Sequence, residues 1–190
     1  MRKKLLQVCL FLGLTASTAI TATAQSVVHA ITGVVTAVNP ATKTLHINPD
    51  DGSQSLFYIL TKQDAPMEFQ KSIRAAATPA TTYASTNSQA IIFYIGDDQV
   101  RTAVAVEDLG PGPFVKTVGT ITKLDKHSIT IKNAAGADET FQIDAKTVGD
   151  ASEGVVEGRK FDVSKGAQVR IIGTSANGVE TALFIRALTL

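Results

Sequence analysis

The side chains best suited to metal binding or proton transfer are three histidines, His29, His46 and His127, which stand far apart in the sequence. Zinc sites draw histidine, cysteine and carboxylate ligands from short, regular spacings, and none of these histidines has another at such a spacing. His46 lies between the apolar residues Leu45 and Ile47, so in an extended strand it would point outward. His29 precedes the first expected strand, and His127 falls in an expected turn. All three are interpreted as solvated surface residues, and no metal ligand or cofactor is expected.

Two pairs of aspartates, Asp50-Asp51 and Asp97-Asp98, are the next candidates for ion binding. A calcium loop alternates several oxygen ligands and closes with a glutamate, and neither pair lies in such a pattern. Aspartate is common in turns because its carboxylate accepts hydrogen bonds from nearby backbone amides. Both pairs are therefore interpreted as hairpin-turn residues.

Nucleophilic catalysis finds little support in the sequence. The serine of "GTSAN" (residues 173–177) lacks the second glycine and the strand-to-helix setting of a nucleophile elbow. The single cysteine, Cys9, lies in the N-terminal apolar run, and the sequence has no phosphate-binding glycine loop. The chain is therefore predicted to be non-enzymatic, with no catalytic residues.

Most of the chain consists of an internal repeat, so any functional site would be built on it. The stretch "ITGVVTAVNPATKTLHINPDDGSQSLFYIL" aligns with "TVGTITKLDKHSITIKNAAGADETFQID" when Gly33 faces Gly119. Further on, "QAIIFYIGDDQVRTAVAVEDL" from Gln89 matches "QVRIIGTSANGVETALFIRAL" from Gln168 without a gap. In both pairs of segments the order of the expected strands, the positions of the turns and the alternation of apolar residues agree. The sequence therefore predicts one small β module used twice.

Each copy has the pattern of short strands, rich in β-branched residues and bounded by turn residues. In the first copy they are expected at residues 31–39, 44–48, 55–60, 90–95 and 100–107. The stretch "DAPMEFQKSIRAAA" between the third and fourth predicts one or two helical turns that begin near Asp64. Its counterpart, "GDASEGVVEGRKF", is rich in glycine and is expected to be looser.

This order of strands, with a helix optional between the third and fourth, is that of the oligonucleotide/oligosaccharide-binding (OB) fold, a small five-stranded barrel. Val35 and Val38 are three residues apart, as are Ile121 and Leu124, and residues so spaced cannot share one face of a regular strand. A β-bulge in the first strand of each copy would turn both inward. The fold class is therefore predicted as all-β, two tandem OB-like barrels, with a two-sheet sandwich as the alternative.

The shared glycine, the threonine- and valine-rich strands, the "DGS" or "AGA" turn and the final hairpin with its "TA" resemble a known group of domains. These are the tandem small β-barrel (OB-like) domains of unknown function found in exported bacterial proteins. The resemblance covers both copies. Since that family has no established catalytic residues, it implies none here.

The N-terminus has the order of a secretory signal peptide: a basic cluster, an apolar run and small residues ending in "ATA". Cleavage after Ala24 would remove three cations and change the formal net charge from +1 to −2. The mature chain is therefore expected to be periplasmic or extracellular, without a transmembrane segment. Nucleic acid is not an expected partner, because nucleic-acid binders usually carry an excess of basic residues.

The expected domain organisation follows from the repeat. Residues 1–24 form the signal peptide, 25–109 the first barrel, 110–114 ("GPGPF") a linker and 115–190 the second barrel.

The outward faces of the two copies differ. Copy one is apolar where copy two has Thr140, Gln142, Asp144 and Arg170. The candidate surface, with a histidine on the neighbouring strand, consists of Leu56, Tyr58, Leu60, Ile91 and His46. Such a patch is either buried against the second barrel or exposed to a partner.

The leading hypothesis is an exported, non-enzymatic binding or assembly module of the bacterial cell envelope or exterior, with a protein partner or self-association. The alternative is a small-ligand carrier or weak enzyme with a site between the two barrels. A third class, nucleic-acid binding, would need Lys123, Lys126 and Lys132 to line one groove with Phe141.

Overall fold

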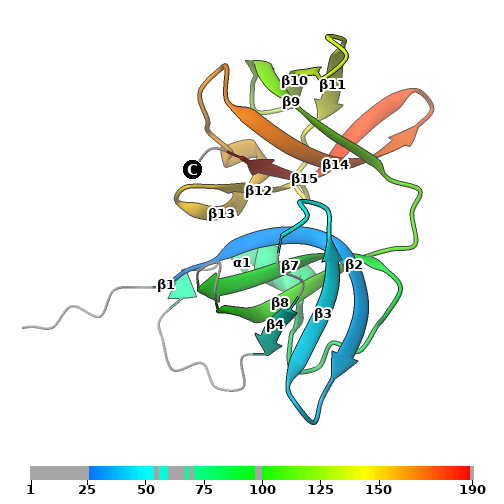
Figure 1. Ribbon diagram of the computed structural model, residues 1–190. Helices are drawn as coiled ribbons and strands as arrows, with labels where there is room; N and C mark the ends of the chain where they lie inside the picture. Colours follow the sequence, from blue (N-terminus) through cyan, green and yellow to red (C-terminus); the bar gives the residue numbers. More distant parts are fainter. Residues whose placement is uncertain (1–25, 54–55, 60–66, 69–70, 97–99, 189–190) are drawn as a thin grey trace, which may run out of the picture.

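The computed structural model describes residues 26–53, 56–59, 67–68, 71–96 and 100–188 (Figure 1). The expected signal peptide, the Asp64 helix start, Leu60 and the pair Asp97-Asp98 lie outside the described residues. The elements, in chain order, are β1 (Ser26–Val27), β2 (His29–Asn39), β3 (Thr44–Pro49), β4 (Leu56–Ile59), β5 (Met67–Glu68), α1 (Lys71–Ala76), β6 (Thr78–Pro79), β7 (Gln89–Gly96), β8 (Arg101–Gly110), β9 (Val115–Leu124), β10 (Ser128–Asn133), β11 (Asp138–Gln142), β12 (Val148–Ala151), β13 (Gly154–Glu157), η1 (Gly158–Lys160), β14 (Gln168–Ala176) and β15 (Val179–Ala187).

The first half of the chain closes into a five-stranded barrel. Its strands are hydrogen-bonded in the order β4-β3-β2-β7-β8, and β4 also pairs with β8, in parallel, where Tyr58 faces Thr102. The expected all-β class is confirmed. A helix is present after β4, and the six residues of α1 agree with the predicted one or two turns. Among the described residues, no helix is long and apolar enough to cross a membrane.

The second half forms a seven-stranded sheet in the order β11-β10-β9-β14-β15-β12-β13, and β11 makes a further parallel pairing with β15 between Gln142 and Thr181. The prediction that "GDASEGVVEGRKF" is loose was wrong, because it contains the paired strands β12 and β13. Gly149 is needed there, since a Cβ on it would lie 2.7 Å from the Phe161 ring. The glycine that suggested a loose segment is instead required by a close contact with Phe161.

The register of the strands repeats from one half to the other. Leu45 pairs with Phe57 in the first barrel, and the equivalent Ile129 pairs with Phe141 in the second sheet. The parallel pairings of β4 with β8 and of β11 with β15 also join equivalent positions. The duplication inferred from the sequence is thus a duplication of strand pairing.

The bulges that the sequence predicted are present in both halves. The register between β2 and β3 shifts between Val35 and Ala37, and the register between β9 and β10 shifts at the equivalent place, beside Ile121. Because of the extra residue, Val38 and Leu124 pack against the interiors of their own halves. The three-residue spacing of apolar side chains is explained by this bulge.

Gly33 and Gly119 lie just before these bulges, where the neighbouring strand approaches closely. A Cβ at Gly33 would lie 2.5 Å from the backbone oxygen of Asn48, and one at Gly119 would lie 2.6 Å from that of Lys132. We expect Gly33→Ala and Gly119→Ala each to reduce the free energy of unfolding by about 1–3 kcal/mol, because strand backbone must move to admit the methyl group.

Chemical denaturation measures this loss, and Thr120→Ala, next to Gly119 in the same strand, is the control with an expected change below about 1 kcal/mol. If both glycine variants were as stable as the wild-type protein, the close approach of the strands would not explain why both copies have glycine at this position.

Each half has its own apolar interior, and a third cluster lies between them. The first interior contains Phe57 and the second contains Phe141. The third cluster, here called the junction core, joins residues of both halves: Val28, Ala30, Ile73, Ile91, Phe93, Ala105, Val148, Ile172 and Phe184. Figure 1 shows the β12–β13 hairpin and β15 facing β2 and β7, with the chain crossing between the halves after β8.

Candidate functional site

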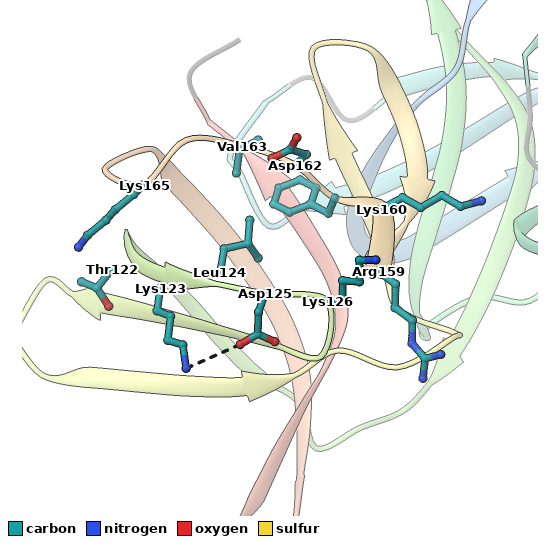
Figure 2. Close-up of a pocket in the computed structure, with 11 residues that line it drawn as sticks. Thr122, Lys123, Leu124, Asp125, Lys126, Arg159, Lys160, Asp162, Val163 and Lys165 are labelled. Atoms are coloured by element: carbon teal, nitrogen blue, oxygen red, sulfur yellow. Dashed lines mark ion pairs between the residues drawn. The ribbon is translucent and has the colours of Figure 1, made fainter.

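A strongly charged hollow lies on the second half, between the β9–β10 turn and the segment that follows β13 (Figure 2). Its volume is about 700 Å³, within the range of small-ligand sites. We call it the basic pocket, and its lining consists of Thr122, Lys123, Leu124, Asp125, Lys126, Arg159, Lys160, Phe161, Asp162, Val163 and Lys165.

Five of these side chains are cationic and two are carboxylates. Lys123 Nζ lies 3.8 Å from Asp125 Oδ2, and Lys160 Nζ lies 3.0 Å from Glu157 Oε2. Among the described residues, Lys126, Arg159 and Lys165 form no ion pair. The pocket therefore carries a local excess of positive charge, which favours an anion.

Local turn chemistry fixes the mouth of the pocket. The Asp125 carboxylate accepts hydrogen bonds from the backbone N–H groups of His127 and Ser128, at 2.8 and 2.9 Å. These bonds, and one from the Ser128 hydroxyl, hold the pKa of Asp125 below its usual range. Asp125 thus stays ionised and orders the turn that carries Lys126.

The floor of the pocket is apolar and continuous with the interior of the second half. Phe161 is buried there, and the partly buried Leu124 and Val163 pack against the same cluster. Figure 2 shows Leu124 and Val163 between Lys165 on one side and Lys126 with Arg159 on the other. A ligand that bound here would meet an apolar surface bordered by positive charge.

Nucleic-acid binding would need three lysines, Lys123, Lys126 and Lys132, to line one groove with Phe141. The described residues do not have this arrangement. Lys123 and Lys126 do line one hollow, but Lys132 pairs with Asp138 and lies outside that lining. Phe141 is completely buried, so it offers no ring for a base to stack on.

A second set of polar groups lies at the junction of the halves, around Asp150 of β12. Its carboxylate is completely buried and accepts hydrogen bonds from His29 Nδ1 at 3.0 Å and from the backbone N–H of Ala30 at 3.2 Å. Arg186 Nε lies 3.7 Å from the same carboxylate. We call these residues the Asp150 network.

The interpretation of His29 as a solvated residue ahead of the first strand was wrong. His29 is the first residue of β2, its side chain is only 23% exposed, and it binds a carboxylate from the other half of the chain. Its partner is 121 positions away, so local pattern could not reveal the contact. His46 and His127 are exposed, as expected.

The turn that carries Asp50 and Asp51 also reaches the other half. Lys116 Nζ donates to Asp50 Oδ1 at 2.7 Å and to Gln89 Oε1 at 2.8 Å. Arg186 Nη1 lies 3.4 Å from Asp51 Oδ2. Both aspartates are turn residues, as interpreted, but their carboxylates also bind cations of the second half.

Among the described members of the predicted surface, one is separated from the rest. Ile91 is completely buried in the junction core. His46 pairs with Leu56 across β3 and β4, and His46 and Tyr58 are exposed, Tyr58 to 50%. His46, Leu56 and Tyr58 therefore lie on an outer face of the first barrel, while Ile91 belongs to the contact between the halves.

The basic pocket was missed because its two lining segments are about 35 residues apart. Its lysines and Arg159 come from two separate stretches, and each stretch mixes its cations with an aspartate, so neither is a run of one charge. Only the pairing of β9 with β14, which places Gly119 opposite Val169, brings the second stretch beside the first.

Comparison with known proteins gives no match: no protein-family model, no curated protein and no solved structure is significantly similar to this chain. Among the described residues, no three histidine, cysteine or acidic side chains are grouped as a metal site requires. The site must therefore be judged from its own geometry.

Proposed function

We propose that this chain is an exported, non-enzymatic binding module of the bacterial cell envelope or exterior, and that its second half binds an anionic ligand in the basic pocket. The observation that carries the proposal is the convergence of five cations, three of them in no ion pair among the described residues, on one hollow with an apolar floor. An acidic oligosaccharide is the ligand class that fits the compartment and the charge.

The strand order supports an OB-like identity for the two halves. In each, the first strand pairs with the second and fourth, and the third pairs in parallel with the fifth. OB folds bind oligonucleotides and oligosaccharides with the loop between their first two strands. In the second half that loop follows Leu124 and forms one wall of the basic pocket.

The proposal predicts that a sulfated hexasaccharide binds the protein and that an uncharged hexasaccharide does not. In the double variant Lys126→Glu/Arg159→Glu, two unpaired cations become anions, so we expect the affinity to fall at least tenfold, a loss of about 1.4 kcal/mol or more. Isothermal titration calorimetry at two salt concentrations measures this, and wild-type affinity should fall as salt rises.

Two controls separate the pocket from net charge. Lys132→Glu/Lys146→Glu makes the same change in charge outside the pocket lining, and Tyr58→Glu adds a negative charge to the first barrel. Both should bind nearly as wild type does. If Lys132→Glu/Lys146→Glu weakened binding as much as Lys126→Glu/Arg159→Glu, the oligosaccharide would respond only to total charge, and the pocket would not be its site.

Assembly with a protein partner or a second copy is the other form that a binding module could take, and it would use the outer face around Leu56 and Tyr58.

The second candidate function, a small-ligand carrier or weak enzyme with a site between the barrels, is favoured by one observation. A hollow of about 280 Å³ lies beside Lys116 and Arg170, at the edge of the junction core.

A further inference from the structure

Arg170 stands in an electrostatically unfavourable place. In the ladder of β14 and β15 it lies directly opposite Arg186, and like charges in that position repel. Arg186 is compensated by Asp51 and Asp150. Among the described residues Arg170 has no ion pair, so its positive charge has no such compensation.

The Arg170 side chain also has an unused donor. Its Nε is buried and has no hydrogen-bond partner among the described residues. A guanidinium group cannot lose its proton at physiological pH, and a buried donor without an acceptor costs about 1–3 kcal/mol. The fold carries this cost at Nε, which is closed to solvent, and an anion in the neighbouring hollow would meet the rest of the same guanidinium group.

The hollow beside Arg170 has room for such an acceptor. Its volume is about 280 Å³, and its lining consists of Asp50, Lys116, Thr117, Val118, Arg170 and Ile172. Asp50 comes from the first half of the chain and the others from the second. The volume is at the lower end of the range for ligand sites, which limits the ligand to a small molecule.

The charges around the hollow favour an anion. The Asp50 carboxylate already accepts hydrogen bonds from Lys116 Nζ and from Gln89 Nε2, at 2.7 and 2.6 Å. Lys116 offsets the charge of Asp50, and the charge of Arg170 is left over. Lys116 donates two of its three N–H groups to Asp50 and Gln89, so one remains for a ligand.

We propose that the hollow between the two halves binds one small oxyanion, a carboxylate or phosphate group of a small molecule, through the Arg170 guanidinium and the third donor of Lys116. The planar guanidinium fork matches both groups, and the exposed Val118 offers contact for a short apolar substituent. This site is separate from the basic pocket, and it gives the second candidate function a ligand class.

The direct test follows the Arg170 side chain in the wild-type protein by nuclear magnetic resonance. Sodium phosphate and sodium acetate are the probes, each against sodium chloride at equal ionic strength. We expect the Arg170 Nε–H signal to shift and saturate with phosphate, acetate or both, and the more effective probe identifies the chemistry. No saturable shift with either probe at 100 mM would overturn the proposal.

Variants provide the second test. The bound anion should raise the unfolding temperature of the wild-type protein with the logarithm of its concentration, and Arg170→Gln should weaken binding about tenfold or more. The basic-pocket variant Lys126→Glu/Arg159→Glu should keep the full effect. An equal effect in Arg170→Gln, or its loss in the basic-pocket variant alone, would contradict a site at Arg170, whatever the result with the hexasaccharide.

Arg170→Met separates a ligand site from a structural role. If Arg170 awaits a ligand, this variant should be at least as stable as wild type in buffer without phosphate or carboxylate, since it removes an uncompensated charge. A large loss of stability there would show that the guanidinium is already satisfied within the fold, and the proposal would fail.

Discussion

Replacing Asp150 by alanine is expected to lower the free energy of unfolding by about 3 kcal/mol. The carboxylate is completely buried, and it is the acceptor for His29 Nδ1 and for the backbone N–H of Ala30. Without it the buried N–H of Ala30 is left without an acceptor, and the partly buried His29 ring loses its partner. Arg186, only 15% exposed, keeps Asp51 as its other carboxylate.

The measurement is chemical denaturation of Asp150→Ala beside Asp138→Ala. Asp138 pairs with Lys132 on the surface, and such pairs contribute at most about 1 kcal/mol. In the double variant Asp150→Ala/Arg186→Met the losses should be less than additive, because the two residues share one network. Strict additivity, or a loss for Asp150→Ala no larger than that of the surface control, would contradict the role assigned to the network.

Burial also acts on the tyrosine beside this network. Tyr94 pairs with His29 across β2 and β7, and Arg186 Nη2 donates to its hydroxyl at 3.4 Å. Burial raises the pKa of Tyr94 above its usual value, against the effect of the nearby arginines. The hydroxyl therefore stays protonated over the physiological range and serves as a neutral acceptor for Arg186.

The sequence was sufficient for what depends on local geometry. A strand that bends inward contains a β-bulge, and the three-residue spacing of Val35 and Val38 predicted this bulge. A strand whose neighbour lies too close for a Cβ needs glycine, and both copies have glycine at that position, Gly33 and Gly119. Because these constraints act within a few residues, two copies with different side chains retain them at the same places.

Contacts between the halves could not be predicted in the same way. His29 meets Asp150, and Lys116 meets Asp50, across separations of 121 and 66 positions. No periodicity links such pairs, since each lies in a segment with an ordinary pattern of its own. The one sign in the sequence was asymmetry: copy two has alanines where copy one has Asp50 and Asp51, and only the turn of copy one docks on the other half.

The two copies meet through equivalent positions, and this explains where they differ. Phe93 and Ile172 are equivalent residues, as are Ala105 and Phe184, and all four belong to the junction core. A large residue in one copy thus corresponds to a smaller one in the other, which lets the faces interlock at high density. Ile91 joins this core, whereas its equivalent Arg170 lines the hollow at the edge.

Phe184→Ala is accordingly expected to remove about 3–5 kcal/mol and to change how the protein unfolds. Phe184 is completely buried in the junction core, beside Val148 and Ile172 in the sheet. The matched control is Phe141→Ala, since Phe141 is equally buried but lies within the interior of the second half. Both variants lose the same atoms, and only one loses them between the halves.

Differential scanning calorimetry distinguishes the two effects. The wild-type protein and Phe141→Ala should each unfold in one transition, with the calorimetric enthalpy equal to the van't Hoff enthalpy. In Phe184→Ala the calorimetric enthalpy should exceed the van't Hoff value, because each half keeps its own interior and can unfold without the other. If Phe184→Ala still unfolded as a single unit, the ionic contacts of Asp50, Asp51 and Asp150 would have to couple the halves by themselves, and the apolar junction core would not be what holds the two halves together.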